Sequence, residues 1–441
     1  MTTGAGAYLQ AAQSYLADAA NWRDDAAAFS GEDVIELYHL RYEQVLPNGL
    51  SAVVVQRIFQ LRTRAAAKLF ALDDLWYDSS RSRFDLVRAR VLRRGGKMLT
   101  GTDRGDLHPG ETGTQPREVA LPRLHAGDRV EVLYLLLPDP SPGWELLGGR
   151  FLGNLFAFRD TFPTLRAQYV LAAPPPLADR LTFSAIGVAP ARRGGSAAGA
   201  ATWTWEAVRQ PAYFRGSDGG SITDRSPFVQ VSGFASWAAM ADWYNDLLAP
   251  RARLSPALQR RLLQLVPPLA PAEAGNPAAI RATVDRAWRY LAGHLDYRGN
   301  ESGIHAYVPA PVGEIFESGA GDCKDGALLL ATWLRAAGVE ADLALVRTPI
   351  MGQLAPGSPD GRVAATVAAF DHALVYIPAT QQWIDTTAPG SLESGLPSSD
   401  QNGLALIVRT GQRNLIRVPA TVSAAARLNL LQLGPAPASG R

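Results

Sequence analysis

The positions of apolar and polar residues divide this chain into two parts. After an alanine-rich start in which aromatic and leucine positions follow helical spacing, apolar and polar residues alternate from Val34 onward. The segment 35–63 is typical of two half-buried strands joined by the turn sequence PNG at 47–49. The pattern predicts an antiparallel β-sandwich-like domain, in which RRGG at 192–195 is a loop. Five later runs also have strand-like patterns and are separated by glycine and proline clusters: RFDLVRARVLRR, DRVEVLYLLL, RAQYVLAA, RLTFSAIGV and ATWTWEAV.

From Ser236 the pattern changes to helical spacing. Ser236 is a candidate N-cap for a helix that stops before Pro250, and a second helix is expected over 277–295. A third and mostly apolar segment, 323–337, ends at Gly338, which suits the position after a helix C-terminus. Three strand-like segments come next: EADLALVRT, HALVYIPA and QQWIDTTA. A helix followed by antiparallel strands is typical of an α+β domain.

These patterns predict an α+β fold class with four consecutive units. We expect a helical lead segment at 1–30, a β-sandwich-like domain at 31–235, an α+β domain at 236–423 and a tail at 424–441. A chain of 441 residues is too long for one compact core, which agrees with two or three domains.

Composition and charge exclude several classes of function. The chain has 43 basic and 41 acidic residues, so the formal net charge is only +2 and no nucleic-acid partner is expected. No apolar stretch reaches the roughly 18 residues of a membrane span, and the first residues lack the pattern of a signal peptide. We therefore expect a cytoplasmic protein by default, or an exported one if the sequence is a piece of a longer chain. No feature of the sequence determines the oligomeric state.

The chain has a single cysteine, Cys323, which excludes an internal disulfide and any zinc site built on several thiolates. No histidine or carboxylate cluster has the spacing of a metal motif such as HExxH. We therefore expect neither a metal nor a cofactor.

Cys323 lies in the stretch GAGDCKDGALLL at 319–330, at the head of an expected helix. Asp322 can cap this helix, which places the cysteine in the first turn, where unpaired N–H groups and the helix dipole favour a thiolate. A cysteine nucleophile also needs a base and a group that orients the base. His372 and Asp385 suit these roles, because they occupy neighbouring strand-like segments, about 4.8 Å apart if paired.

These segments resemble the transglutaminase-like superfamily. GAGDCKDGALLLATWLRAAGVEADLALV is similar to the nucleophile helix and following strand of that family, FDHALVYI to its histidine strand and QWIDTTAPG to its aspartate strand. The resemblance implies a papain-like α+β core with Cys323 as nucleophile, His372 as base and Asp385 as orienting group. YHLRYEQVLPNGLSAVVVQRIFQL and LPSSDQNGLALIV are similar to a bacterial subgroup that carries an N-terminal β domain of unknown function. One departure from the family pattern lies in the turn after the aspartate strand. In WIDTTAPG a threonine stands where a proline is expected in a "DPT"-like turn.

Two functions follow from this reading. The first is thiol-dependent acyl transfer or hydrolysis on a peptide or carboxamide bond, with a protein or peptide substrate; protease, amidase and cross-linking activities share the same triad. The second is a non-catalytic module that binds a protein or polysaccharide. The N–H of Cys323 is a candidate donor to an oxyanion, while the second donor and the role of Lys324 stay open. His294 and His305 are weaker candidates for the wall of the cleft.

Overall fold

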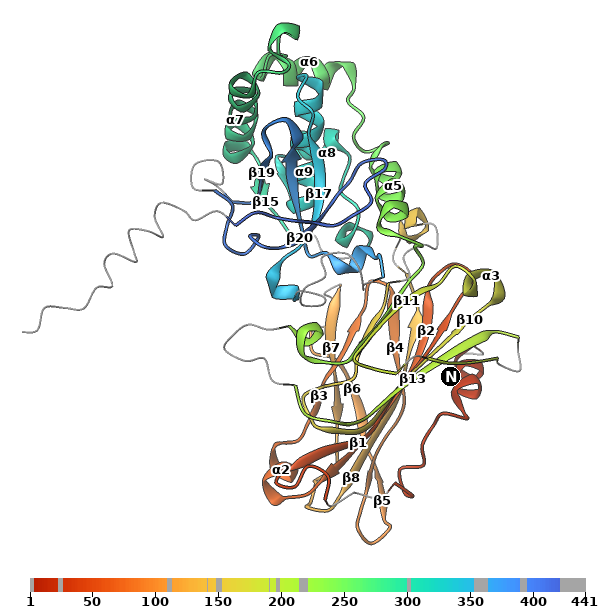
Figure 1. The fold of residues 1–441 in the computed structure, drawn as a ribbon. Coiled ribbons are helices and arrows are strands. Elements are labelled where there is room, and N and C mark those ends of the chain that lie inside the picture. The colour runs from red at the N-terminus through yellow and green to blue at the C-terminus, as the bar shows by residue number, and fades with distance from the viewer. Residues whose placement is uncertain are drawn as a thin grey trace, which may run out of the picture.

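The computed structural model describes residues 4–22, 27–108, 113–140, 142–147, 153–189, 191–195, 199–213, 221–299, 303–352, 364–388 and 395–420. A β part (residues 34–232) and an α+β part (residues 237–420) lie one below the other in Figure 1. The mixed α+β class expected from the sequence is correct. The domain boundary expected at Ser236 stays a prediction; a strand ends at Ser232 and a helix begins at Trp237.

An eight-stranded sheet forms the centre of the β part. Its strand order is β12-β13-β10-β1-β2-β8-β4-β5, and all neighbours pair antiparallel except β1 and β10. The hairpin expected around PNG joins β1 and β2. RRGG at 192–195 was expected to be a loop; instead it forms the edge strand β12, because β13 offers it a partner. The strands are β1 (Val34–Val45), β2 (Ser51–Leu61), β4 (Ser82–Leu92), β5 (Met98–Thr100), β8 (Arg129–Pro138), β10 (Thr164–Ala173), β12 (Arg192–Gly195) and β13 (Ala201–Gln210).

Two three-stranded sheets cover one face of this large sheet. Alternation along β2 explains the layers, since Val53 and Val55 pack toward the small sheets and Val54 packs on the other face. One small sheet has the order β3-β7-β6 and the other the order β11-β14-β9. Their strands are β3 (Leu72–Asp78), β6 (Thr102–Asp106), β7 (Thr114–Ala120), β9 (Leu155–Ala157), β11 (Thr182–Ile186) and β14 (Phe228–Ser232). Short helices α2 (Arg64–Leu69), α3 (Pro175–Ala178) and α4 (Ile222–Arg225) lie in the connections.

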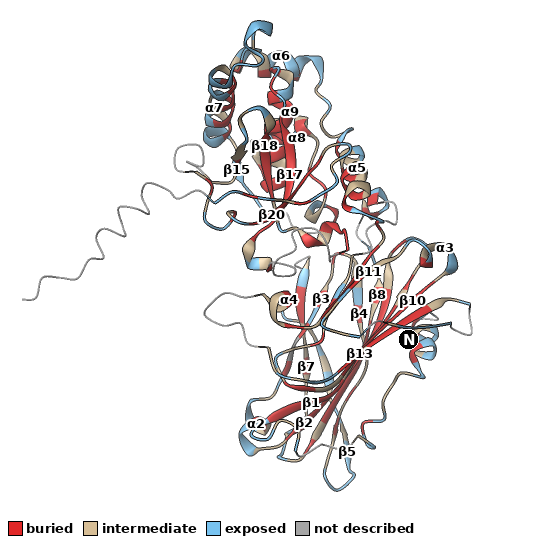
Figure 2. Ribbon diagram, viewed as in Figure 1, coloured by how far each residue is buried: buried red, intermediate tan, exposed pale blue. Residues whose placement is uncertain are grey.

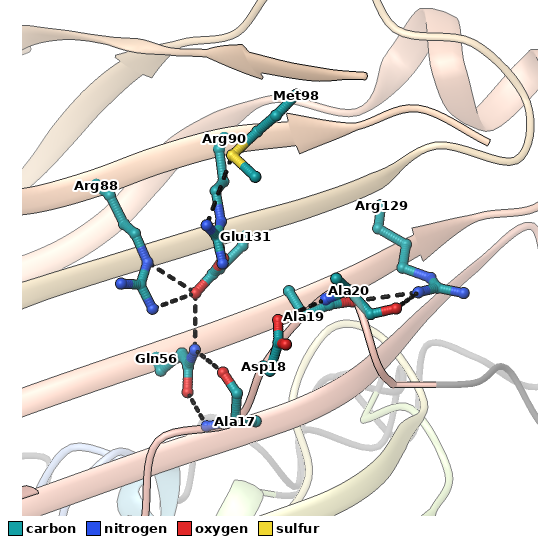
Figure 3. A network of polar contacts seen from close by, with 10 residues as sticks. All are labelled: Ala17, Asp18, Ala19, Ala20, Gln56, Arg88, Arg90, Met98, Arg129 and Glu131. Carbon is teal, nitrogen blue, oxygen red and sulfur yellow. Dashed lines mark hydrogen bonds and ion pairs between the residues drawn. The ribbon is translucent and has the colours of Figure 1, made fainter. Parts of the chain in front are cut away.

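The N-terminal segment, with helix α1 (Ala5–Ala12), covers the opposite face of the large sheet. Figure 3 shows how its backbone is held. Gln56 accepts a hydrogen bond from the N–H of Ala17 (2.8 Å) and donates both to the carbonyl of Ala17 (2.9 Å) and to Glu131 (2.7 Å). Glu131 is fully buried and is neutralised by ion pairs with Arg88 and Arg90. This network satisfies a charge that would otherwise be costly to bury.

The α+β part is built around one buried helix, α9 (Cys323–Ala336). It packs between a five-stranded antiparallel sheet, of order β19-β18-β17-β20-β21, and helices α6, α7 and α8. Figure 2 shows α9 and the adjacent strands almost entirely in the colour of buried residues. The helices are α5 (Trp237–Leu248), α6 (Pro256–Leu265), α7 (Pro277–His294) and α8 (Val312–Ser318). The strands are β17 (Asp342–Arg347), β18 (His372–Ile377), β19 (Gln382–Ile384), β20 (Leu404–Ile407) and β21 (Ile416–Arg417); β15 (Asp296–Tyr297) and β16 (Ala320–Gly321) form a separate pair.

No helix of the described residues is both long and apolar enough to cross a bilayer.

Replacing Leu330 by alanine is expected to lower the free energy of unfolding by about 2–5 kcal/mol, since a fully buried side chain is lost and a cavity remains. Urea denaturation of the purified chain measures the change. Leu69→Ala is the matched control, because that leucine is 84% exposed and its loss should change stability by less than about 0.5 kcal/mol. Equal effects of the two substitutions would contradict the central position of α9.

Candidate functional site

The first turn of α9 is fixed by a reciprocal capping box. The side chain of Asp322 accepts hydrogen bonds from the N–H groups of Lys324 (2.9 Å) and Asp325 (3.3 Å), and Asp325 accepts one from the N–H of Asp322 (3.1 Å). A second oxygen of Asp325 accepts from the N–H of Ala310 (2.8 Å). These bonds hold Cys323 at the first helical position, as the sequence predicts. Among the described residues, no acceptor contacts the N–H of Cys323.

Cys323 lies in the wall of a cavity of about 290 Å³ between the two parts of the chain, and the residue is 8% exposed. Tyr244 and Tyr307 line the cavity from the α+β part, and the hydroxyl of Tyr244 donates to the carbonyl of Tyr307 (2.6 Å). Asp78 and Thr114 line it from the β part. The cysteine is therefore buried in the helix packing on one side and reachable from a small cavity on the other.

His372 and Asp385 reach the cysteine from the end of the five-stranded sheet. His372 is the first residue of β18 and Asp385 directly follows β19, so their antiparallel pairing brings them to the same end. His372 Nε2 lies 3.4 Å from Asp385 Oδ1, and His372 lines the same cavity as Cys323. The structure thus brings all three residues together.

The electrostatics of these groups favour a charged histidine. Burial alone would lower the pKa of His372, but hydrogen bonds with Asp385 and Cys323 and their charges outweigh burial and raise the pKa to about 10. Burial would raise the pKa of Asp385, but His372 holds it below its ordinary value. The N–H and hydroxyl of Thr387 each donate to Asp385 at 2.8 Å, which fixes its carboxylate.

The site forms at the end of the strands, and α9 packs against the sheet face that carries Ala373 and Val375. One expectation from the sequence is not met. Neither His294 nor His305 lines the cavity that contains Cys323. The ring of His294 instead stacks on Tyr290, one helical turn away, with ring centres 4.0 Å apart.

Lys324, which had no role from sequence alone, is 7% exposed and lines the same cavity. Its ammonium lies 2.7 Å from Asp322 Oδ2. Burial alone would lower the pKa of Lys324, but the charges of Cys323 and Asp322 raise it above its ordinary value. A buried cation therefore lines the same cavity as Cys323.

Sequence reasoning missed Asp400. This carboxyl group is 2% exposed and lies with His372 and Asp385 in one cluster, in which the candidate ligand atoms are all within 4.8 Å of one another. Burial and the charge of Asp385 raise the pKa of Asp400 to about 6. Its only sequence signal was a place in LPSSDQNGLALIV, a segment that follows Asp385 in the chain and that no pattern marked as part of the site.

A second cluster of possible metal ligands lies in the β part and comprises Glu36, His39 and Asp160. Arg57 already occupies its centre, donating to Glu36 (2.6 Å) and Asp160 (2.8 Å). A guanidinium therefore supplies the positive charge that a cation would bring. The β part also holds a larger cavity of about 1180 Å³, lined by residues of α2 and β7 and by the segment that follows β7, and it contains none of the groups above.

Comparison with known proteins gives a family match and an extensive structural likeness. Residues 47–214 match the model of a domain of unknown function with a solved structure, DUF3857. The chain is similar to the crystal structure of a "putative protease" from Parabacteroides distasonis ATCC 8503, with a TM-score of 0.64 and 15% identity over 88% of this chain and 72% of that chain. Among curated proteins, none matches this chain at a significant level.

Weaker likenesses involve two further solved structures. An M1 zinc metallopeptidase from Deinococcus radiodurans has a TM-score of 0.25 and 12% identity, over 46% of this chain and 42% of that chain. Leukotriene A4 hydrolase from Saccharomyces cerevisiae has a TM-score of 0.23 and 11% identity, over 51% of this chain and 32% of that chain. TM-scores of 0.25 and 0.23 are too low to support an argument. What remains is the fold shared with the Parabacteroides protein and the match of residues 47–214 to DUF3857.

Proposed function

We propose that this chain is a transglutaminase-like cysteine enzyme that transfers or hydrolyses an acyl group of a peptide or carboxamide. The observation that carries the proposal is the contact of Cys323, His372 and Asp385 at a capped helix N-terminus, beside a cavity. The likeness to the Parabacteroides protein supports a peptidase-type reaction, although at 15% identity it supports the fold first.

The reaction begins with attack of the Cys323 sulfur on the substrate carbonyl carbon. The negative charge that develops on the carbonyl oxygen is stabilised by the N–H of Cys323, and the nearby ammonium of Lys324 favours negative charge in the same cavity. His372 gives its proton to the leaving amine, and the C–N bond breaks to leave a thioester on Cys323. Asp385 keeps the imidazole oriented during this transfer.

In the second step His372 accepts a proton from the incoming nucleophile, which attacks the thioester and releases Cys323. Water as nucleophile gives hydrolysis, and a primary amine gives cross-linking. The triad serves both outcomes, so the choice depends on what the cavity between the two parts admits.

The test uses a pool of peptides and glutamine-containing proteins together with a fluorescent primary amine. We expect the wild-type chain to produce new amino termini, free ammonia or incorporated amine, and each product distinguishes one reaction type. Cys323→Ala should lose all of them, by a factor of about 10³ or more, because the covalent step is removed. Activity that survives in Cys323→Ala would contradict the proposal. If the wild-type chain binds a peptide or protein but forms none of these products, the non-catalytic binding module is favoured instead.

A further inference from the structure

A second buried carboxyl group stands beside the carboxylate of Asp385. Asp400 lies in the turn before β20, and its Oδ1 accepts a hydrogen bond from the hydroxyl of Ser399 (2.9 Å). Its Oδ2 is buried, and no donor contacts it among the described residues. Asp385 uses its Oδ1 for His372 and Thr387. Two carboxyl groups thus share one small volume, and one of their oxygens has no donor.

Such a pair is costly if both groups are ionised. Two buried carboxylates in close proximity repel each other, and one of them usually keeps its proton. A buried acceptor without a donor carries a further penalty. One proton on Asp400 removes both costs, because it cancels the repulsion and turns the unpartnered oxygen into a donor in a cluster that contains the carboxylate of Asp385.

We propose that Asp400 is a positioning residue of the Cys323 site, whose protonated carboxyl group donates a hydrogen bond to Asp385 and holds that carboxylate against His372. The role rests on the proposed function, although the hydrogen bond itself does not. The titratable groups that face Asp400 are His372, at the start of β18, and Asp385, after β19.

The hydrogen bond depends on pH near neutrality. Because the pKa of Asp400 is raised to about 6, the proton is present below that pH and leaves above it. Loss of the proton places a second negative charge beside His372 and Asp385 and removes the support of Asp385. The orientation of Asp385 and His372 should therefore change near pH 6. An isolated Cys–His pair with a histidine pKa near 10 would show no such change at that pH.

The test compares Asp400→Asn, which keeps a donor but cannot titrate, with Asp400→Ala, which has no donor. Two readouts are followed from pH 5 to 8: the imidazole resonances of His372 in isotope-labelled protein and the rate at which iodoacetamide alkylates Cys323. We expect an inflection near pH 6 in both readouts for the wild type and none in Asp400→Asn. At pH 5 the alkylation rate of Cys323 in Asp400→Asn should stay within about twofold of the wild-type rate. Asp400→Ala should react about tenfold more slowly at all pH values. Asp342→Asn, a buried carboxyl paired with Arg335 on the same sheet, is the control that keeps the inflection.

An inflection near pH 6 that persists in Asp400→Asn would overturn the proposal. An inflection that shifts when a chelator is added would also overturn it, since the cluster would then hold a cation. The two proposals fail separately. If Cys323 of the wild type reacts no faster than a free thiol at any pH, the proposed function fails, while the resonances of His372 still report whether Asp400 titrates beside it.

Discussion

Replacing His372 by asparagine is expected to slow the alkylation of Cys323 by iodoacetamide at pH 6 by about a hundredfold. In the wild type His372 and Cys323 line the same cavity, and we expect an imidazolium there to favour the thiolate, which is the reactive form. An asparagine carries no charge, so the sulfur loses this partner. An ordinary thiol is less than about 1% ionised at pH 6, which sets the size of the effect. Because Cys323 is the only cysteine, intact-mass measurement follows the reaction without ambiguity.

The difference between the two proteins should depend on pH in a defined direction. Near pH 9 an ordinary thiol is largely ionised, so the rate ratio should fall to a few-fold. Stability should follow the same linkage, since the folded pKa of His372 is raised from 6.5 to about 10. The stabilising contribution of His372 is fully present below about pH 6.5 and is lost as the pH rises through about 10. His294→Asn, an exposed histidine outside the site, serves as the control; equal rates for His372→Asn and the wild type at pH 6 would remove His372 from the mechanism.

Local patterns in the sequence were sufficient for the elements that carry the site. The capping sequence around Asp322 determines where α9 begins, because a side-chain acceptor three residues before an acidic residue satisfies the first N–H groups whatever the tertiary context. The alternation in HALVYI and the short connection to QQWID determine that His372 and Asp385 lie at the same sheet end. Periodicity likewise predicted β1, β2, β4, β8, β10 and β13 of the large sheet, since each of these strands buries one face or both.

Other features depend on contacts between segments far apart in the chain. RRGG has poor strand propensity and becomes β12 only because the edge of β13 is available. The side of the sheet on which α9 packs is decided by Ala373 and Val375, and alternation alone cannot tell which face receives a helix. The sequence assigned no role to Asp400, because its importance lies in burial beside His372 and Asp385 of other elements. It assigned none to Lys324 either, because the burial of that side chain in the cavity wall has no local pattern. The cavity joins residues of both parts, and no local pattern specifies such an arrangement.

Replacing Gly326 by alanine is expected to slow the alkylation of Cys323 at pH 6 by about ten- to a hundredfold. Gly326 lies in the first turn of α9, and a Cβ there would come within 2.4 Å of Thr386 Oγ1 and 2.9 Å of Thr386 Cβ. Thr386 directly follows Asp385, so any displacement of the threonine moves the carboxylate that orients His372. Misplacement of a catalytic group by about 1 Å can cost about a hundredfold in rate. The glycine therefore permits the close approach between the cysteine helix and the aspartate segment.

Stability and reactivity should respond to this substitution separately. Alanine improves helix propensity by about 1 kcal/mol, while the clash costs about 1–3 kcal/mol, so the free energy of unfolding should fall only modestly. Gly293→Ala in α7 is the matched control, since a Cβ there meets no atom within 4 Å and reactivity should not change. Thr386→Gly in the Gly326→Ala background removes both clashing atoms, and the hydroxyl it deletes has no hydrogen-bond partner in the described part of the chain. The double variant should therefore recover most of the alkylation rate. If it stays as slow as Gly326→Ala, the loss arises within the helix rather than from the position of Asp385.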